Sequence, residues 1–367
     1  MLKKSFCNID MPVLGLGLMR LPKNDLGKID YQKANQMVDY AIKNGIKYFD
    51  TAYPYHDGES EIFIGEALKR YERDEFYLAS KMPIWEVKEK KEVREIFFKQ
   101  LEKCQVEYFD FYLCHAMSLD RHNVYKDLDA YNELLKLKKE GYIKNLGFSF
   151  HDTPTALEVI VKEINWDFAQ LQLNYLDWTM QDAKRQYEIL NNNNIPCVVM
   201  EPVRGGALAN VCMDAEKIFK EKSDKSIASW ALRFVASLPN VCVVLSGMSN
   251  MEQLTDNINT FTDFKYLSED DKLTIDKAKK AILGNKFIPC TGCKYCMPCP
   301  YGVNIARSFA IYNQYQIDKD KERFIKRIND LKEEEKFDKC MECGMCMLQC
   351  PQQIKIPQEL KKLSEEM

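Results

Sequence analysis

Eight of the fourteen cysteines in this 367-residue chain lie in two short runs near its C-terminus. Within each run only two or three residues separate neighbouring cysteines, and a proline follows the last one. Thiolates at this spacing, ending in Cys-Pro, are typical ligands of [4Fe–4S] clusters. The chain is therefore expected to handle electrons. The two runs are Cys290, Cys293, Cys296 and Cys299, followed by Cys340, Cys343, Cys346 and Cys350.

The second run, C-x2-C-x2-C-x3-C-P, resembles the pattern of two-cluster bacterial ferredoxins, and the first is one residue short before its last cysteine. In that pattern the fourth cysteine of each run ligates the cluster of the other run. By analogy, Cys350 would join the first three cysteines of the first run. Cys299 would join the first three of the second.

Structural zinc is the alternative, because four-thiolate zinc sites also use C-x-x-C pairs. Those pairs are usually separated by a loop, whereas each run here brings its thiols almost back to back. Zinc also gives no reason for the two prolines. The pattern favours two [4Fe–4S] clusters.

A second group of reactive side chains follows three apolar runs in the first third of the chain. Asp50 and Tyr55 follow one run, Lys81 the next, and His115 the third. A tyrosine with its ordinary pKa of about 10 is a poor proton donor at neutral pH, but a nearby ammonium favours the phenolate. Asp50 could pair with Lys81, and His115 could orient a carbonyl oxygen. Together they could move a proton at an oxygen while hydride moves at its carbon.

An alternation of strand and helix patterns is expected to position these residues. Between about residues 10 and 260, eight short apolar runs alternate with eight amphipathic stretches, which predicts a (β/α)8 TIM barrel. The expected strands are Val13–Leu18, Ile46–Asp50, Phe76–Ser80, Phe109–Cys114, Ile143–Phe148, Phe168–Leu173, Cys197–Glu201 and Val241–Ser246. The expected helices are Tyr31–Asn44, Ser60–Arg70, Lys88–Lys103, Tyr125–Lys139, Thr153–Glu163, Thr179–Asn192, Lys225–Ser237 and Asn250–Asn259.

The pattern changes after about Ser268. A charged helix is expected over Asp270–Leu283, and a long helical spacer, Ile305–Phe337, separates the cysteine runs. Such a spacer indicates a small α-helical ferredoxin-like domain. The expected organisation is a barrel over 1–268, a linking helix over 269–284 and the ferredoxin-like domain over 285–367.

Composition argues against several other functions. The formal net charge, 52 − 55 = −3, offers no basic field for nucleic acid, and no apolar stretch approaches a membrane span. The N-terminus lacks the apolar core of a signal peptide. Free buried thiols are expected at the remaining cysteines, which predicts a reducing, cytoplasmic location. They are Cys7, Cys104, Cys114, Cys197, Cys212 and Cys242.

The motif Asp50-Thr-Ala-x-x-Tyr55, with Ser80-Lys81 and Leu113-Cys-His115, resembles the catalytic tetrad of the aldo-keto reductase superfamily. The resemblance covers roughly residues 10–260, and the cysteine runs extend it to the ferredoxin-fused branch. It implies a catalytic role for all four residues, with Tyr55 as proton donor. It also implies reduction of a small carbonyl or quinone-like molecule by NAD(P)H.

The resemblance also implies cofactor contacts after the later strands. The lysine and arginine that clamp the 2′-phosphate in NADPH-dependent members fall on Gly247 and Gln253, which carry no charge. Weak selectivity for NADPH is therefore expected. The implied contacts are Ser149, Gln172, Arg204, Gly247, Ser249, Gln253 and Asn257.

The purpose of the clusters stays open, because hydride transfer moves two electrons and a cluster moves one. A flavin usually mediates between them. Three functions are compatible: an NAD(P)-dependent reductase, a reductase coupled to an external ferredoxin or flavoprotein that does not use nicotinamide directly, and a non-catalytic electron carrier or redox sensor. The intact tetrad argues against the last.

Overall fold

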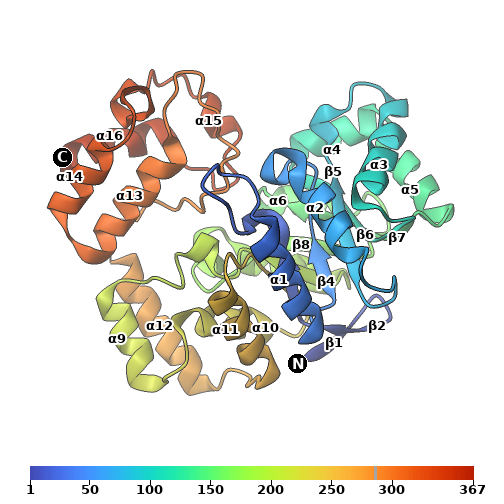
Figure 1. The fold of residues 1–367 in the computed structure, drawn as a ribbon, viewed down its shortest axis with the longest axis horizontal. Helices are drawn as coiled ribbons and strands as arrows, with labels where there is room; N and C mark the ends of the chain where they lie inside the picture. The colour runs from blue at the N-terminus through green and yellow to red at the C-terminus, as the bar shows by residue number, and fades with distance from the viewer. Residues whose placement is uncertain (285–286) are drawn as a thin grey trace. The chain divides into compact units, whose positions relative to one another are not determined.

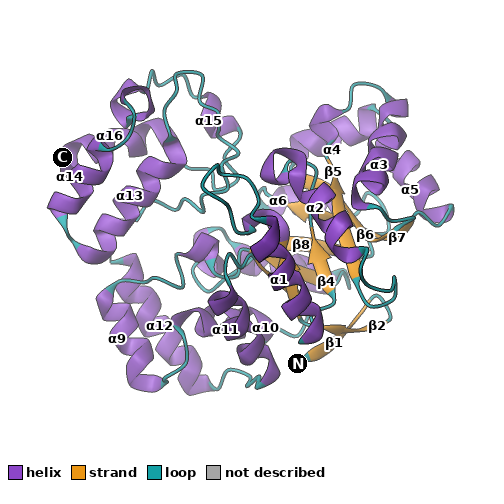
Figure 2. Ribbon diagram, viewed as in Figure 1, coloured by secondary structure: helices purple, strands orange, loops and turns teal. Residues whose placement is uncertain are grey.

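The computed structural model describes residues 1–284 and 287–367. In this part of the chain, eight parallel strands close into a barrel in the order β10-β3-β4-β5-β6-β7-β8-β9, which confirms the predicted fold class. Figure 2 shows barrel strands in orange among the purple helices. Each strand overlaps an expected apolar run. The strands are β3 (Leu14–Gly17), β4 (Tyr48–Asp50), β5 (Tyr77–Met82), β6 (Phe109–Met117), β7 (Ile143–Phe150), β8 (Phe168–Gln172), β9 (Cys197–Met200) and β10 (Val241–Ser246).

Helices follow the barrel strands, as expected (Figure 1). One difference is the stretch Tyr125–Lys139, which forms two helices because the backbone turns at Asp129, where φ is 52°. The helices of this part are α1 (Tyr31–Lys43), α2 (Glu59–Leu68), α3 (Lys90–Cys104), α4 (Leu119–Asp127), α5 (Ala130–Lys139), α6 (Pro154–Ile160), α7 (Asp177–Met180), α8 (Ala183–Asn192), α10 (Ile227–Ala236) and α11 (Met251–Thr262).

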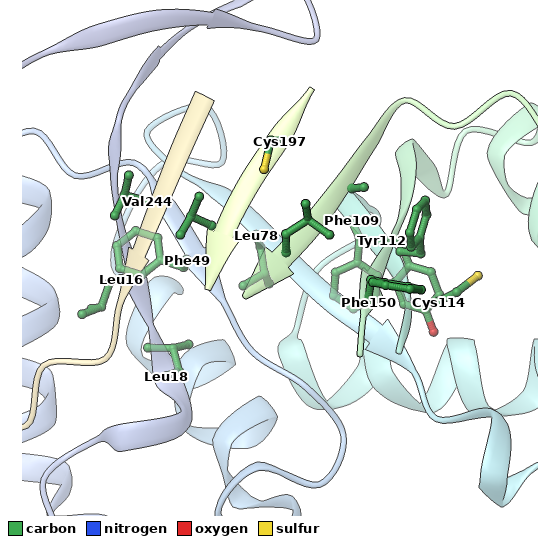
Figure 3. Packing of buried hydrophobic residues seen from close by; sticks show 14 of the residues in the cluster. Leu16, Leu18, Phe49, Leu78, Phe109, Tyr112, Cys114, Phe150, Cys197 and Val244 are labelled. Carbon is green, nitrogen blue, oxygen red and sulfur yellow. The ribbon is translucent and has the colours of Figure 1, made fainter. Parts of the chain in front are cut away.

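The strands have two buried faces, and their side chains alternate between them. Leu16, Phe49 and Leu78, from adjacent strands, pack in a layer that also contains helix residues (Figure 3). Tyr48 and Ala79 lie one position away and fill the barrel interior. Asp50 and Lys81 each lie two positions beyond these interior residues. Strand parity therefore directs both polar side chains into the barrel.

An N-terminal hairpin, β1 (Lys3–Phe6) and β2 (Ile9–Pro12), was not expected from the sequence. Its Phe6 ring stacks on Phe111 at a centroid distance of 4.8 Å and meets Phe168, the first residue of β8, edge-on. The hairpin thus completes the apolar packing at the amino ends of the strands. This is the end opposite to the one that carries chemistry in such barrels.

The described residues divide into two compact units: 1–202 with 232–266, and 203–231 with 267–367. In the second unit α9 (Met213–Lys222), which was not expected, packs against α12 (Glu269–Leu283), the predicted linking helix (Figure 1). The predicted domain start at 285 lies outside the described residues. The long spacer forms α13 (Ile305–Asp318) and α14 (Lys321–Asn329), followed by α15 (Met345–Leu348) and α16 (Ile356–Glu366). No helix among the described residues is long and apolar enough to cross a membrane.

Candidate functional site

The four tetrad residues come from three adjacent strands. Asp50 is the last residue of β4, Lys81 lies near the end of β5, and His115 lies near the end of β6. Tyr55 begins the short 3-10 turn Tyr55–Gly58 after β4. Asp50, Lys81 and His115 are only 1–3% exposed, whereas Tyr55 is half-buried. The structure thus assembles the predicted group around one partly accessible hydroxyl.

Lys81 is the centre of this group. Its Nζ atom donates to Asp50 Oδ1 at 2.6 Å, to the Thr51 carbonyl at 2.7 Å and to the Tyr55 hydroxyl at 3.3 Å. The same Nζ lies 4.8 Å from the centroid of the Tyr55 ring. An ammonium at this position stabilises negative charge on the phenolic oxygen.

Asp50 is held from two sides. Burial raises the pKa of its carboxyl, while the adjacent Lys81 ammonium acts in the opposite direction. Gln170, from β8, donates to the second carboxylate oxygen at 3.2 Å. A buried ion pair needs such additional hydrogen bonds to offset the loss of hydration. Gln170 was missed in the sequence, although it is one of two glutamines, with Gln172, in a strand that is otherwise apolar.

His115 lies beside both aromatic residues of the site. Its ring centroid is 6.2 Å from that of Tyr55 and 5.1 Å from that of Trp85. Burial lowers the pKa of His115 well below its ordinary value, and Lys81 acts in the same direction. His115 is therefore a neutral imidazole near neutral pH. A neutral imidazole can donate a hydrogen bond to a carbonyl oxygen without protonating it.

Behind Lys81 lies a buried polar network that sequence reasoning also missed. Ser80 Oγ donates to Glu61 Oε1 at 2.7 Å, and Gln100 Nε2 donates to the same oxygen at 2.6 Å. Gln100 also donates to the Lys81 carbonyl at 3.1 Å. Ser80 faces the helices because it neighbours the inward-facing Lys81. The network fixes the backbone of β5 at Lys81.

Several residues implied as cofactor contacts already have partners. Ser149 Oγ accepts from the Ala116 amide at 2.7 Å, and Gln172 Nε2 donates to Asp177 at 2.9 Å. Asn257 Nδ2 donates to Ser246 Oγ at 2.9 Å. These bonds hold strand ends and loops in place. Their role toward a nucleotide stays a prediction.

The other three implied contacts of the barrel follow β10: Gly247 and Ser249 lie in the loop after it, and Gln253 lies in the first turn of α11. Ser249 Oγ donates to the Arg20 carbonyl at 2.8 Å, and the Ser249 amide donates to Gln253 Oε1 at 2.8 Å. A Cβ added at Gly247 would lie 3.1 Å from side-chain carbons of Arg20, whose guanidinium binds Glu201 at 3.0 Å. The uncharged position 247 therefore lies beside a cation, Arg20, which ends the 3-10 helix Leu18–Arg20.

The second unit contains two cavities lined by the eight cysteines. Cys290, Cys293, Cys296 and Cys350 line one cavity. Cys299, Cys340, Cys343 and Cys346 line another. These two sets of four cysteines are the ones that crossed ligation predicts. Arg204, an implied nicotinamide contact, belongs by its packing to this same unit.

Each cavity offers four thiols, which is the ligand set of one [4Fe–4S] cluster. A zinc site would draw its sulfurs to about 2.3 Å from one point. Burial raises the pKa of Cys290 to about 11 and that of Cys296 to about 12, so their thiolates need a cationic group in the cavity.

Comparison with known proteins agrees with both parts of this description. The model of the aldo/keto reductase family matches residues 13–280, and that of the 4Fe-4S dicluster domain matches residues 289–354. The first match alone covers well over half of the chain. The second includes all eight cysteines of the two runs.

Several characterised and uncharacterised bacterial proteins are similar to the barrel. The uncharacterised oxidoreductase YqkF of Bacillus subtilis is 26% identical, covering 75% of this chain and 95% of that protein. Glyoxal reductase of the same organism is 28% identical, covering 74% and 90% respectively. An NADH-specific methylglyoxal reductase of Escherichia coli is 24% identical, covering 63% and 83%.

Solved structures show the same fold. An aldo-keto reductase of Bacillus halodurans in its holo form superposes with a TM-score of 0.64 at 25% identity, covering 76% of this chain and 96% of that one. An aldo-keto reductase of Klebsiella pneumoniae in complex with NADPH gives a TM-score of 0.62 at 20% identity, covering 76% and 95%. With the family models, these likenesses show that the chain is an oxidoreductase of the aldo/keto reductase family that carries a C-terminal 4Fe-4S dicluster domain.

Proposed function

We propose that the chain reduces the carbonyl group of a small molecule with hydride from a nicotinamide dinucleotide, and that Tyr55 is the proton donor. One observation carries this proposal. The Lys81 ammonium lies 3.3 Å from the Tyr55 hydroxyl and 2.6 Å from Asp50, in a site from which water is largely excluded. A low-dielectric site of this kind makes the charge on Lys81 effective at the phenolic oxygen.

Each residue has its own role in the proposed reaction. The nicotinamide, when bound, supplies hydride to the carbonyl carbon. His115 donates a hydrogen bond to the carbonyl oxygen, and the Tyr55 hydroxyl transfers its proton to that oxygen as the C–H bond forms. Lys81 stabilises the resulting phenolate, and Asp50 with Gln170 holds Lys81 in place. A proton from solvent then restores Tyr55, which is the only half-exposed member of the four.

The substrate class is proposed from the relatives. Proteins named glyoxal reductase and methylglyoxal reductase are 28% and 24% identical to this chain. Small 2-oxoaldehydes are therefore the first substrates to test. The Trp85 ring beside His115 also supports a substrate with a flat, partly apolar body.

We also propose that the eight cysteines hold two [4Fe–4S] clusters. Two cavities, each with four thiols, support this number. The anaerobically purified protein should then contain about eight irons per chain and show the broad charge-transfer absorption of such clusters. A zinc content of one or two per chain without iron would exclude the clusters.

The decisive experiment is an anaerobic assay with methylglyoxal and either NADH or NADPH. Tyr55→Phe should lower kcat by about 10²–10⁴-fold while nucleotide binding is kept, because only the proton donor is lost. Tyr53→Phe is the matched control, since it removes a hydroxyl from a neighbouring half-buried tyrosine whose ring packs on Lys103. Equal activity in Tyr55→Phe and Tyr53→Phe would contradict the proposed proton donor.

A reductase served by an external ferredoxin or flavoprotein is the second candidate. The neutral Gly247 and Gln253, in place of the cationic phosphate clamp, favour it over an NADPH enzyme. In that case neither nucleotide would bind, and turnover would require a reduced ferredoxin or flavodoxin. Bleaching of the clusters by NADH or NADPH would instead require a bound flavin, which the isolated protein should then release on denaturation. A pure electron carrier would show reversible one-electron chemistry with no dependence on a carbonyl substrate.

A further inference from the structure

The segment that follows β9 has an unusual backbone. Arg204, Gly205 and Gly206 form a 3-10 turn in which all three residues have positive φ, at 50°, 64° and 94°. This conformation costs glycine little, but it is uncommon for a residue with a long side chain. A non-glycine residue held in such a strained conformation often serves a function. The turn belongs to the same compact unit as the cysteine runs.

Gly205 brings this turn against the first cysteine run. A Cβ at Gly205 would lie 2.3 Å from the carbonyl oxygen of Thr291 and 2.9 Å from its carbonyl carbon. Thr291 directly follows Cys290 and is itself buried. Only glycine permits so close an approach of two backbones. The turn and the cysteine run are thus packed together as one piece of structure.

Arg204 is consequently a buried cation next to the first cysteine run. It is 5% exposed, and the residue that follows it, Gly205, contacts the backbone of Thr291, which directly follows Cys290. Cys290 Sγ also accepts a hydrogen bond from the Gly292 amide at 3.4 Å. Hydrogen bonds to sulfur, nearby charge and solvent exposure are the properties by which a protein sets the potential of a cluster. Lys294 in the same run is a second cation, but it is exposed.

We propose that the buried guanidinium of Arg204 raises the reduction potential of one cluster. This is the cluster held by Cys290, Cys293, Cys296 and Cys350. This inference rests on the proposed clusters. One-electron reduction adds a unit of negative charge to the cluster and its thiolates, and a fixed cation stabilises the reduced form more than the oxidised form.

The test is an anaerobic redox titration of the whole protein, followed by EPR and visible absorption. Arg204→Gln and Arg204→Met both remove the charge, with side chains of different polarity. The titration needs only one of these two variants to incorporate iron. Arg204→Lys retains the charge. Lys294→Gln is the matched control, because it removes an exposed cation from the same run, where solvent and salt screen it.

In the neutral variants we expect one of the two cluster transitions to move to lower potential. At a fixed potential the ratio of reduced to oxidised cluster should fall about tenfold, which corresponds to about 59 mV for a one-electron couple. The reduction potential of this transition in Arg204→Lys should stay near that of the wild type. The potential should change less in Lys294→Gln than in Arg204→Gln. A shift in Arg204→Lys as large as in Arg204→Gln would overturn the role of the charge, and so would unchanged transitions in the neutral variants. Absence of iron from the wild-type protein would instead refute the proposed clusters themselves.

Discussion

The Nζ atom of Lys81 lies 2.6 Å from a carboxylate oxygen of Asp50, and the two side chains are 1% and 5% exposed. Neither charge can be hydrated by bulk water, so each depends on the other and on the hydrogen bonds from Lys81 to Thr51 and from Gln170 to Asp50. Removing one partner leaves a buried charge without compensation, whereas removing both does not. This asymmetry gives the first prediction.

Lys81→Met should lower the free energy of unfolding by about 3–5 kcal/mol, because Asp50 stays buried without its cation. The double variant Asp50→Asn with Lys81→Met should recover a large part of that loss. Urea unfolding followed by far-UV circular dichroism measures both. Lys3→Met is the control, since the Lys3–Asp10 pair has a similar 2.8 Å distance but side chains that are 52% and 73% exposed. Its effect should stay below about 1 kcal/mol. A double variant no more stable than Lys81→Met would contradict the pairing.

A pH dependence follows from His115. Burial places its pKa in the folded protein well below the unfolded value, so on acidification the unfolded chain binds the proton first. The contribution of the neutral imidazole to the free energy of unfolding is complete above the unfolded pKa of about 6.5 and is lost as the pH falls below it. Below that pH the free energy of unfolding of the wild type should decrease by about 1.4 kcal/mol per pH unit more than that of His115→Asn.

The measurement is urea unfolding of both proteins between about pH 7.5 and about pH 5, where the difference between the two curves isolates one proton. His151, whose pKa burial lowers to about 4, is present in both proteins and cancels in the comparison. Parallel curves would mean that His115 titrates in the folded protein with an ordinary pKa, and that it is not a fixed neutral hydrogen-bond donor.

The nucleotide preference is open to a gain-of-function test. Gly247→Lys with Gln253→Arg should improve NADPH binding relative to NADH by about 10–100-fold, because a hydrogen bond to a charged group contributes about 1.5–3 kcal/mol. The three atoms nearest to a Cβ at 247 all belong to the flexible side chain of Arg20, at 3.1–3.2 Å, so the site can adjust. Glu252→Lys controls for added positive charge on the same helix. Equal Kd ratios for the double variant and the wild type, by fluorescence titration, would show that the phosphate does not bind at this loop.

Local patterns were sufficient to predict the barrel and the four reactive residues. Each strand is a short apolar run, and Asp50, Lys81 and His115 are polar residues at the ends of such runs. Alternation places Asp50 on the same strand face as Tyr48 and Lys81 on the same face as Ala79, but the structure was needed to show that this face is the interior one. The match of the aldo/keto reductase family model to residues 13–280 supports the predicted barrel, while the roles of the four residues stay a prediction.

What the sequence did not reveal depends on contacts between distant segments. Gln170 binds Asp50 across 120 residues, and Glu61 reaches Ser80 from a helix whose pattern gives no sign of a buried carboxylate. The strands of the N-terminal hairpin are too short and too polar to show a period of two. Arg204 was interpreted through the barrel because it follows a barrel strand, whereas the approach of Gly205 to Thr291 became visible only in the structure.

Crossed ligation gives the last prediction, and a pair of double variants tests it. Cys299 and Cys340 come from different runs but line the same cavity, so Cys299→Ala with Cys340→Ala should destroy one cluster and retain about four irons per chain. Cys299→Ala with Cys290→Ala removes a thiol from each cavity and should destroy both clusters. Ligation within each run predicts the reverse: the first pair would lose both clusters and the second would lose one. Iron analysis with EPR of the reduced proteins separates the two schemes. The two variants lose the same number of thiols, so a general loss of stability would affect both alike, and only the assignment of Cys299 to a cavity makes them differ.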